Sequence, residues 1–214
     1  MKNITNLIYV ASITILTTIQ SAAQIAEGIA FGLKGGVNQN STTITKKPKN
    51  HIVNLGGVGV DRGFQVGGWA TIRLSRWLFL DNDLHFLRRN NRYEDQFHKE
   101  IVYAINNYNY LGLGSRIGVT YKGIFASLGP ELNLLLAKKV AGGSEAPALE
   151  WGINGRLGYQ YKRIRAEVFY SRSLSPYEKK TWNFTPTENV YSLFMSRSIG
   201  VSVGIMLFKS KKNR

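Results

Sequence analysis

Three side chains that can bind a metal or exchange protons lie at alternate positions of one short segment: Asp81, Asp83 and His85. Residues two apart in an extended strand point to the same side of that strand, so these three would share one face. Carboxylate and imidazole groups arranged in this way can hold a cation or act as an acid–base set. In a small packed interior, such groups more often pair with opposite charges, and we favour that interpretation.

A glycine-rich stretch, GGVGVDRG at residues 56–63, is the second candidate for chemistry. Glycine-rich loops hold phosphate when they lead into a helix N-terminus, but this stretch leads into a strand pattern. His51 and His98 lie in segments expected to be loops, with no acid at ligand spacing. The chain contains no Cys, which excludes disulfides and thiolate metal sites. We therefore expect no catalytic residue, no metal site and no cofactor.

The N-terminus reads MKNITNLIYVASITILTTIQSAAQ, in which Lys2 precedes an apolar run and small residues close the segment at Ala23. This order is typical of a secretory signal peptide, and we expect residues 1–23 to be cleaved. The alternative is a membrane-anchor helix, but the apolar run is shorter than the roughly 20 residues that a spanning helix needs. The sequence therefore predicts an exported protein.

The charge is strongly positive, with 28 Lys and Arg against 13 Asp and Glu. Removing residues 1–23 takes away one Lys and no acid, which leaves 27 basic residues, 13 acidic residues and a formal charge of +14. Such a balance points to nucleic acid or to an anionic membrane surface. Export argues against nucleic acid, so we expect lipid as the anionic partner.

Apolar and polar residues alternate along eight segments, which is the period of a strand with two unlike faces. Two-residue turns are expected at Ser75-Arg76, Lys122-Gly123 and Lys162-Arg163, whereas the other connections are long. The alternating segments lie near residues 29–38, 64–74, 78–86, 110–121, 124–136, 150–161, 165–171 and 196–207, and the long connections near 39–62, 88–105, 138–149 and 173–190.

Short turns at one end and long loops at the other are typical of outer-membrane barrels. The sequence therefore predicts an all-β, eight-stranded antiparallel up-and-down transmembrane β-barrel with short periplasmic turns and four longer outer loops. The barrel domain would span residues 24–208, and residues 209–214 would form a basic tail. Pro130 lacks the N–H that a ladder needs, so we expect a local bulge there.

The polar face of these segments combines small residues with charges of both signs, which suits a narrow interior in which the charges pair. A register slip of one residue would turn several arginines toward lipid, at about 2–4 kcal/mol each near the midplane. The expected lumenal charge network comprises Lys34, Arg73, Asp81, Asp83, Arg116, Glu131, Arg156, Arg165 and Glu167.

Aromatic residues near the segment ends would form the two girdles of such a barrel. We expect Phe86, Trp151 and Tyr170 near the outer ends, and Tyr121, Tyr159 and Tyr161 near the periplasmic ends. The long loops carry exposed cations that anionic headgroups would attract. These are Lys46, Lys47, Lys49, Arg88, Arg89, Arg92, Lys138, Lys139, Lys179 and Lys180.

Several stretches in order resemble the PorT-like family of outer-membrane β-barrels from bacteria of the Bacteroidota type. They are FGLKGGVN, GFQVGGWATIRLS, LDNDLHFLRRN, LGPELNLLL and AEVFYSRSLS, followed by a last strand that ends in the aromatic Phe208. The stretch YLGLGSRIG and the tail KSKKNR depart from the family pattern. The resemblance implies an integral outer-membrane protein, in a family of which some members are tied to protein secretion.

Three classes of function remain open. We favour a non-enzymatic scaffold, or an assembly or secretion partner, that acts through its outer loops on other envelope or secretion proteins. The alternative is a narrow pore for ions or small solutes. A barrel enzyme acting on lipid would need a Ser–His set near the outer rim, and the sequence offers no convincing one.

Overall fold

A computed structural model describes residues 28–46, 55–59, 61–97, 100–139, 144–185 and 188–210 of the chain. The expected signal peptide, His51, His98 and most of the expected basic tail lie outside these residues. In the described part, no helix has the length and apolar character needed to cross a membrane. The strands are β1 (Gly28–Lys46), β2 (Leu55–Gly59), β3 (Asp61–Arg73), β4 (Leu78–Phe97), β5 (Glu100–Tyr121), β6 (Ile124–Lys139), β7 (Ser144–Glu145), β8 (Leu149–Tyr161), β9 (Ile164–Ser173), β10 (Glu178–Thr185) and β11 (Glu188–Lys209).

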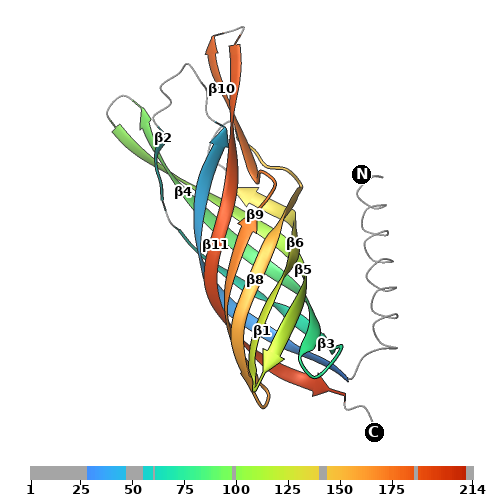
Figure 1. Cartoon of the computed structure of the whole chain (residues 1–214). Helices are drawn as coiled ribbons and strands as arrows, with labels where there is room; N and C mark the ends of the chain where they lie inside the picture. The colour runs from blue at the N-terminus through green and yellow to red at the C-terminus, as the bar shows by residue number, and fades with distance from the viewer. Residues whose placement is uncertain are drawn as a thin grey trace.

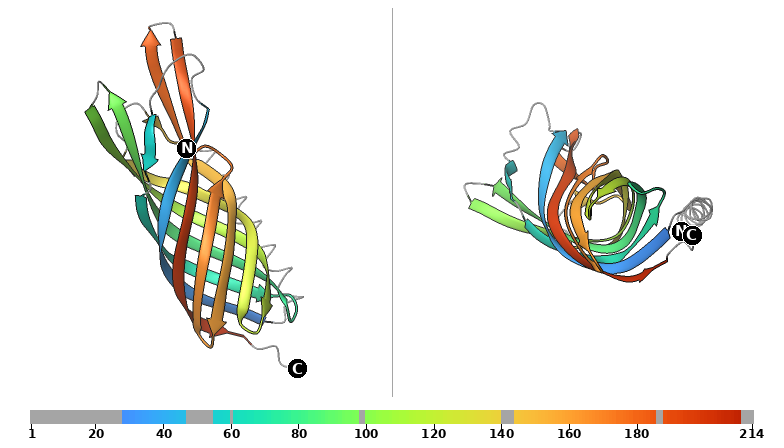
Figure 2. Two further views of the ribbon diagram at one scale, coloured as in Figure 1. Left: turned by 60° about the vertical axis from the view of Figure 1, so that its left-hand side comes forward. Right: turned by 60° about the horizontal axis from the view of Figure 1, so that its bottom comes forward.

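Eight of these strands close into one antiparallel barrel, in the order β1-β3-β4-β5-β6-β8-β9-β11 with β11 paired back onto β1 (Figure 1). The shorter strands β2, β7 and β10 are not part of this ring. Strand β2 pairs with β4, β10 pairs with β11, and β7 pairs with β10. The tilted view of Figure 2 shows the strands surrounding a single axis. The fold class predicted from the alternation is confirmed.

The barrel is apolar outside and polar inside, and β9 shows this most plainly. Its residues are exposed and buried in strict alternation. Val168 is 49% exposed, whereas Arg165 and Glu167, earlier in the same strand, are 3% and 4% exposed. Because side chains of a strand point alternately to its two faces, the same backbone serves an apolar exterior and a charged interior, the arrangement of a barrel surrounded by lipid.

The connections at one end of the barrel, hereafter the turn end, are short. Lys122 and Gly123 both have positive φ, at 47° and 90°, as does Lys162 at 50°. Turns of this hand match the right-handed twist of paired strands. The third connection is longer than the expected two residues, because β3 ends at Arg73 and β4 begins at Leu78. The Ser75 hydroxyl stabilises it by accepting hydrogen bonds from the backbone N–H groups of the two residues that follow Arg76.

The opposite end, hereafter the hairpin end, is richer in strands than the sequence predicted. The expected loop at 88–105 is largely a hairpin, since β4 continues to Phe97 and β5 begins at Glu100. Much of the expected loop at 173–190 is likewise strand, in β10 and the first part of β11. Both hairpins project beyond the barrel (Figures 1 and 2). The stretch RRNNRYEDQF is polar at almost every position, so no alternation marked it as strand.

The bulge expected at Pro130 is absent. The β5–β6 register is the same at Gly114↔Glu131 as at Ile117↔Leu128, and β6 pairs with β8 without a shift through Pro130. The β5–β6 ladder skips two residue pairs at this point, so the missing N–H of Pro130 leaves the register unchanged. The shift in this pair of strands lies instead at Asn109/Tyr110, nearer the hairpin end.

Candidate functional site

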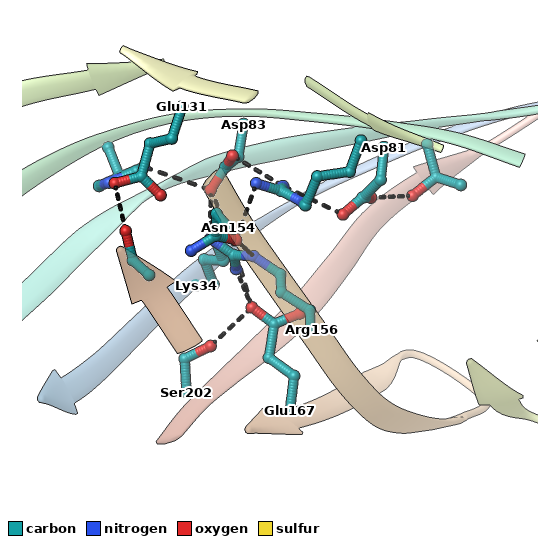
Figure 3. Close-up of polar contacts among 12 residues, drawn as sticks. Lys34, Asp81, Asp83, Glu131, Asn154, Arg156, Glu167 and Ser202 are labelled. Atoms are coloured by element: carbon teal, nitrogen blue, oxygen red, sulfur yellow. Dashed lines mark hydrogen bonds and ion pairs between the residues drawn. The ribbon is translucent and has the colours of Figure 1, made fainter. Parts of the chain in front are cut away.

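The middle of the lumen is crossed by a set of buried charges, hereafter the central ionic layer. Its members come from five strands: β1, β4, β5, β8 and β9. Every member is at most 4% exposed. Figure 3 shows most of them converging from opposite walls. The layer consists of Lys34, Asp81, Asp83, Arg116, Arg156, Arg165 and Glu167.

Asp83 on β4 is bound by three cations. Its carboxylate oxygens lie 2.6 Å from Lys34 Nζ, 2.7 Å from Arg116 Nη2 and 2.8 Å from Arg156 Nη2. The Nδ1 atom of His85 is 3.2 Å from the same carboxylate. These cations occupy the positions that a metal would need. Across the described residues, no group of three or more His, Cys, Asp or Glu side chains is arranged to hold a metal ion.

The other two carboxylates extend the layer across the barrel. Arg165 on β9 donates from both terminal nitrogens to Asp81 on β4, each at 2.9 Å. Strands β4 and β9 stand opposite each other in the ring of eight, so this pair spans the lumen. Glu167 accepts from Arg165 Nε at 2.9 Å, from Arg156 and from Lys34.

Glycines on the inner face make room for these long side chains. A Cβ on Gly114 would overlap the Arg116 guanidinium and the Asp83 carboxylate. A Cβ on Gly112 would overlap the ring of His85. An eight-stranded barrel has an interior only just wide enough for side chains, so these positions must lack one of their own.

Two residues expected in the charge network lie apart from the central ionic layer. Glu131 is buried, but it receives hydrogen bonds from the Asn133 amide at 3.0 Å and the Ser171 hydroxyl at 3.3 Å, and no described cation pairs with it. Arg73 ends β3 at the turn end, where it is exposed and has no ion-pair partner within the described ranges. Arg73 therefore lies outside the charge network in which it was expected, because the lumenal parity continues past the point where the lumen opens.

A second closed level lies toward the hairpin end, and we name it the hairpin-end cluster. Its aromatic part is tightly packed, with the Tyr108 ring 5.4 Å from the Tyr177 ring and 6.2 Å from the Tyr110 ring. All members are at most 4% exposed. They are Leu87, Arg89, Tyr108, Tyr110, Glu150, Tyr177, Glu178 and Phe194.

Specific polar contacts also hold this cluster together. Arg89 Nη1 binds Glu150 at 2.7 Å, and the Arg89 guanidinium lies over the Tyr110 ring at 5.1 Å. The Tyr108 hydroxyl donates to the Glu178 carboxylate. The Tyr177 hydroxyl is 2.8 Å from the hydroxyl of Thr42 on β1. The cluster thus joins β10 and the residues before it to the barrel wall.

Arg89 was expected to be an exposed loop cation, and that expectation is wrong: it is 1% exposed and ion-paired. The signal that could have found it is parity. Asp81, Asp83 and His85 continue through residue 87 to Arg89 on the same face of β4. Lys138, Lys139 and Arg88 are exposed at the hairpin end, as expected.

A small void of about 10 Å³ lies beside the hairpin-end cluster, lined in part by Asn38, Gln65, Arg89 and Glu131. That volume is about the minimum for one water. Asn38 Oδ1, Gln65 Nε2 and Arg89 Nε are buried without a hydrogen-bond partner. The site is polar enough for a water, while the space around it is filled by side chains.

The turn end of the lumen is more open, with a cavity of about 370 Å³, hereafter the turn-end cavity. Arg165 of the central ionic layer lines it on the lumen side. Its other lining residues are Gly28, Ile29, Ala30, Thr71, Arg73, Phe79, Thr120, Phe125, Gln160, Met206, Lys209 and Ser210. Sequence reasoning did not predict this cavity, because it depends on where the side chains of several strand ends stop filling the interior.

Of the six residues expected in the aromatic girdles, Tyr121, Trp151, Tyr159, Tyr161 and Tyr170 are exposed on the outer surface, and Phe86 is half-buried. Further aromatics accompany them that the sequence reasoning did not assign to the girdles. Trp77 is 67% exposed at the turn end. Phe31 stacks on Phe208 at 5.1 Å, and Phe64 packs beside Phe86 at 5.9 Å.

Solved structures with a similar fold are small outer-membrane barrels. Outer membrane protein OprG from Pseudomonas aeruginosa aligns with a TM-score of 0.53 at 13% identity, over 87% of this chain and 98% of that chain. Neisserial surface protein A gives a TM-score of 0.47 at 13% identity, over 82% and 96%. Ail from Yersinia pestis, in complex with the heparin analogue sucrose octasulfate, gives 0.45 at 9% identity, over 85% and 99%. No protein-family model matches the chain, and no curated protein matches it. The likeness to OprG supports the barrel fold alone.

Proposed function

We propose that this chain is an integral outer-membrane barrel with a packed lumen, which acts as a non-enzymatic scaffold or as an assembly or secretion partner. The apolar exterior supports insertion in lipid: residues such as Leu33, Leu157 and Val203 are 55–60% exposed. The turn end would face the periplasm and the hairpin end the cell exterior, following the usual asymmetry of such barrels.

The observation that carries the proposal is that side chains close the lumen at two levels. The central ionic layer ties β4 to β9 across the interior, and the hairpin-end cluster fills the space above it. An interior of this size, occupied largely by paired side chains, supports a lumen without a continuous water column. A barrel without a passage presents its projecting hairpins as the parts available to a partner.

Conductance in planar bilayers tests the closed lumen. We expect the purified barrel to show no steady conductance, with a porin reconstituted in the same way as the positive control. Large, stable, ohmic channels from the wild-type protein would contradict the closed lumen.

Cross-linking in intact cells tests the partner role of the hairpins. A photo-reactive residue at Tyr103 or Tyr191, in the two projecting hairpins, should give a discrete adduct with an envelope protein. The same residue at Tyr121, exposed at the turn end, is the matched control for unspecific capture. Adducts that are equal at all three positions would argue against a partner role for the hairpins.

Membership of the PorT-like family remains part of this proposal and rests on the stretches quoted above. A link to protein secretion follows only from that resemblance. Outer-membrane lipid is the proposed constant partner, and we propose neither nucleic acid nor a cofactor. If the hairpin adduct is a component of a secretion system, the link to secretion gains support.

A narrow pore is the second candidate, and the void beside the hairpin-end cluster is what favours it. Unpartnered polar atoms of Asn38, Gln65 and Arg89 border this void, so water there is chemically reasonable. A pore would need that water to connect with both ends. Small but steady cation or anion currents in the bilayer experiment, absent from an empty-membrane control, would favour this candidate over the scaffold.

A further inference from the structure

The turn-end cavity has the dimensions of a small-ligand site. Its volume of about 370 Å³ lies near the lower end of the roughly 300–1,000 Å³ of ligand pockets. Arg73, Lys209 and Ser210 on its rim are exposed, whereas Phe79 and Phe125 on its wall are 3% and 4% exposed. The cavity therefore runs from the surface of the turn end into the interior.

Part of the cavity wall is apolar, beside polar side chains such as Thr71 and Gln160. Phe79 and Phe125 pack edge to face with their ring centres 6.2 Å apart. Met206 adds aliphatic surface from β11. Aromatic and aliphatic side chains held in this way offer a preformed surface for an apolar ligand body.

At its inner end the cavity is lined by a cation whose three guanidinium nitrogens are all hydrogen-bonded to carboxylates. Arg165 gives its Nε to Glu167 and its Nη1 and Nη2 to Asp81. Its guanidinium also lies 4.2 Å from the centre of the Phe125 ring. A ligand that drew Arg165 away from Glu167 and Asp81 would break ion pairs of the central ionic layer.

The rim of the cavity carries the free positive charge. Arg73 and Lys209 are both exposed, and neither forms an ion pair with any residue that the structure describes. None of the described residues that line the cavity carries a carboxylate side chain. An apolar wall below two unneutralised cations is complementary to a molecule with an apolar body and a single acidic group.

We propose that the turn-end cavity binds a small amphiphilic anion, whose apolar body lies against Phe79, Phe125 and Met206 and whose carboxylate contacts Arg73 and Lys209. This inference goes beyond the proposed function and does not depend on whether the barrel is a scaffold or a pore. With the turn end facing the periplasm, the ligand would come from that compartment.

Methyl NMR can test this site without confusion from ligand that dissolves in the membrane. In protein labelled at methionine methyl groups and held in lipid nanodiscs, Met206 lines the cavity. Met195, on the same strand but toward the hairpin end, serves as the internal reference. We expect sodium octanoate to shift the Met206 signal saturably and to leave Met195 unchanged. Octanol, which has the same apolar body without the charge, should bind about tenfold more weakly.

Variants of the rim test the charge recognition. Arg73→Gln with Lys209→Gln should weaken octanoate binding about tenfold, the order expected from two exposed ion pairs, and should leave octanol binding unchanged. Arg88→Gln with Lys139→Gln removes two exposed cations at the hairpin end and is the matched control. All four residues are exposed, so folding, checked by the heat-modifiable gel shift, should be retained.

Three results would overturn the inference. The first is a Met206 signal that does not saturate or that moves in parallel with Met195, which would mean that octanoate only partitions into lipid. The second is equal affinity for octanoate and octanol. The third is an octanoate affinity that survives the Arg73→Gln/Lys209→Gln change or falls equally in the Arg88→Gln/Lys139→Gln control.

Discussion

The central ionic layer and the hairpin-end cluster occupy the same lumen but use different kinds of side chain. The central layer joins four cations and three carboxylates through ion pairs of 2.6–3.4 Å. The hairpin-end cluster is mostly aromatic and contains one described ion pair, between Arg89 and Glu150. The lumen is therefore closed by ion pairs at its middle and mainly by aromatic packing toward the hairpin end.

The difference teaches what each level contributes. Buried ion pairs add little net stability, because desolvation offsets the attraction, but losing one partner is costly. The central layer therefore mainly specifies register and strand order. Burying an aromatic or aliphatic side chain contributes about 1.5–3 kcal/mol. The hairpin-end cluster is thus expected to supply stability, and removing one polar group there should cost less.

The largest effect is expected from Asp83→Ala, which leaves Lys34, Arg116 and Arg156 short of a shared partner. We expect a loss of about 3–5 kcal/mol in the free energy of unfolding, measured by urea titration in detergent or lipid. Glu145→Ala, at an exposed position, is the control and should behave as wild type. Wild-type stability of Asp83→Ala would mean that water already solvates the layer.

Arg89→Ala should cost about 2 kcal/mol, because it leaves the buried Glu150 carboxylate without its described cation. Glu150 keeps a hydrogen bond from the Ser196 hydroxyl at 3.0 Å, which limits the loss. A double-mutant cycle with Glu150→Ala should recover about 1–2 kcal/mol of coupling. Strict additivity in the cycle would show that Arg89 and Glu150 do not stabilise each other, as for two independent surface charges.

Tyr108→Phe should cost about 1 kcal/mol by removing the hydrogen bond to Glu178. The Asn106 amide, 3.5 Å from the same carboxylate, compensates for part of the loss. Tyr110→Phe is the matched control, because the buried Tyr110 hydroxyl has no hydrogen-bond partner within the described residues, and it should be neutral or slightly stabilising. If both changes cost the same by urea titration, the Glu178 contact is not what holds Tyr108.

Glu131→Gln should have the smallest effect, below about 1 kcal/mol, since the amide keeps the shape of the side chain. Glu131 has hydrogen bonds from Asn133 and Ser171 but no described cation beside it. The comparison with Asp83→Asn, equally conservative in shape, separates burial from ion pairing. A loss of unfolding free energy as large as that of Asp83→Asn would mean that Glu131 is electrostatically coupled to the central ionic layer.

The fold was predictable because a strand that lies between lipid and a charged interior has apolar and polar residues at alternate positions. The same alternation placed Lys34, Asp83 and Arg165 on the inner face before any contact was known. Which of them meet was not predictable, because partners such as Lys34 and Glu167 are 133 residues apart in sequence and meet only through barrel curvature. Arg73 lies outside the expected charge network because parity gives the face of a strand and not the depth at which the lumen opens.

The hairpin-end cluster was missed for a different reason. Glu178 and Tyr177 belong to a connection in which polar and aromatic residues follow no period, so their burial depends on how that segment folds over the barrel end. Arg89 carried a usable signal, since it continues the inner parity of β4. The length of the first projecting hairpin gave none, because the stretch RRNNRYEDQF is polar at almost every position.

The separation of the ion-paired residues along the chain has a consequence for how the protein assembles. Lys34 lies on the first barrel strand, whereas its partner Glu167 lies on β9, which is brought close to β1 when β1 meets β11 and closes the ring. Closing so long a chain segment costs entropy before any contact compensates. Before ring closure, water must hydrate the cations on the inner face of the open sheet. Ring closure must therefore also displace this water. The same late step thus completes the strand pairing and removes water from the interior.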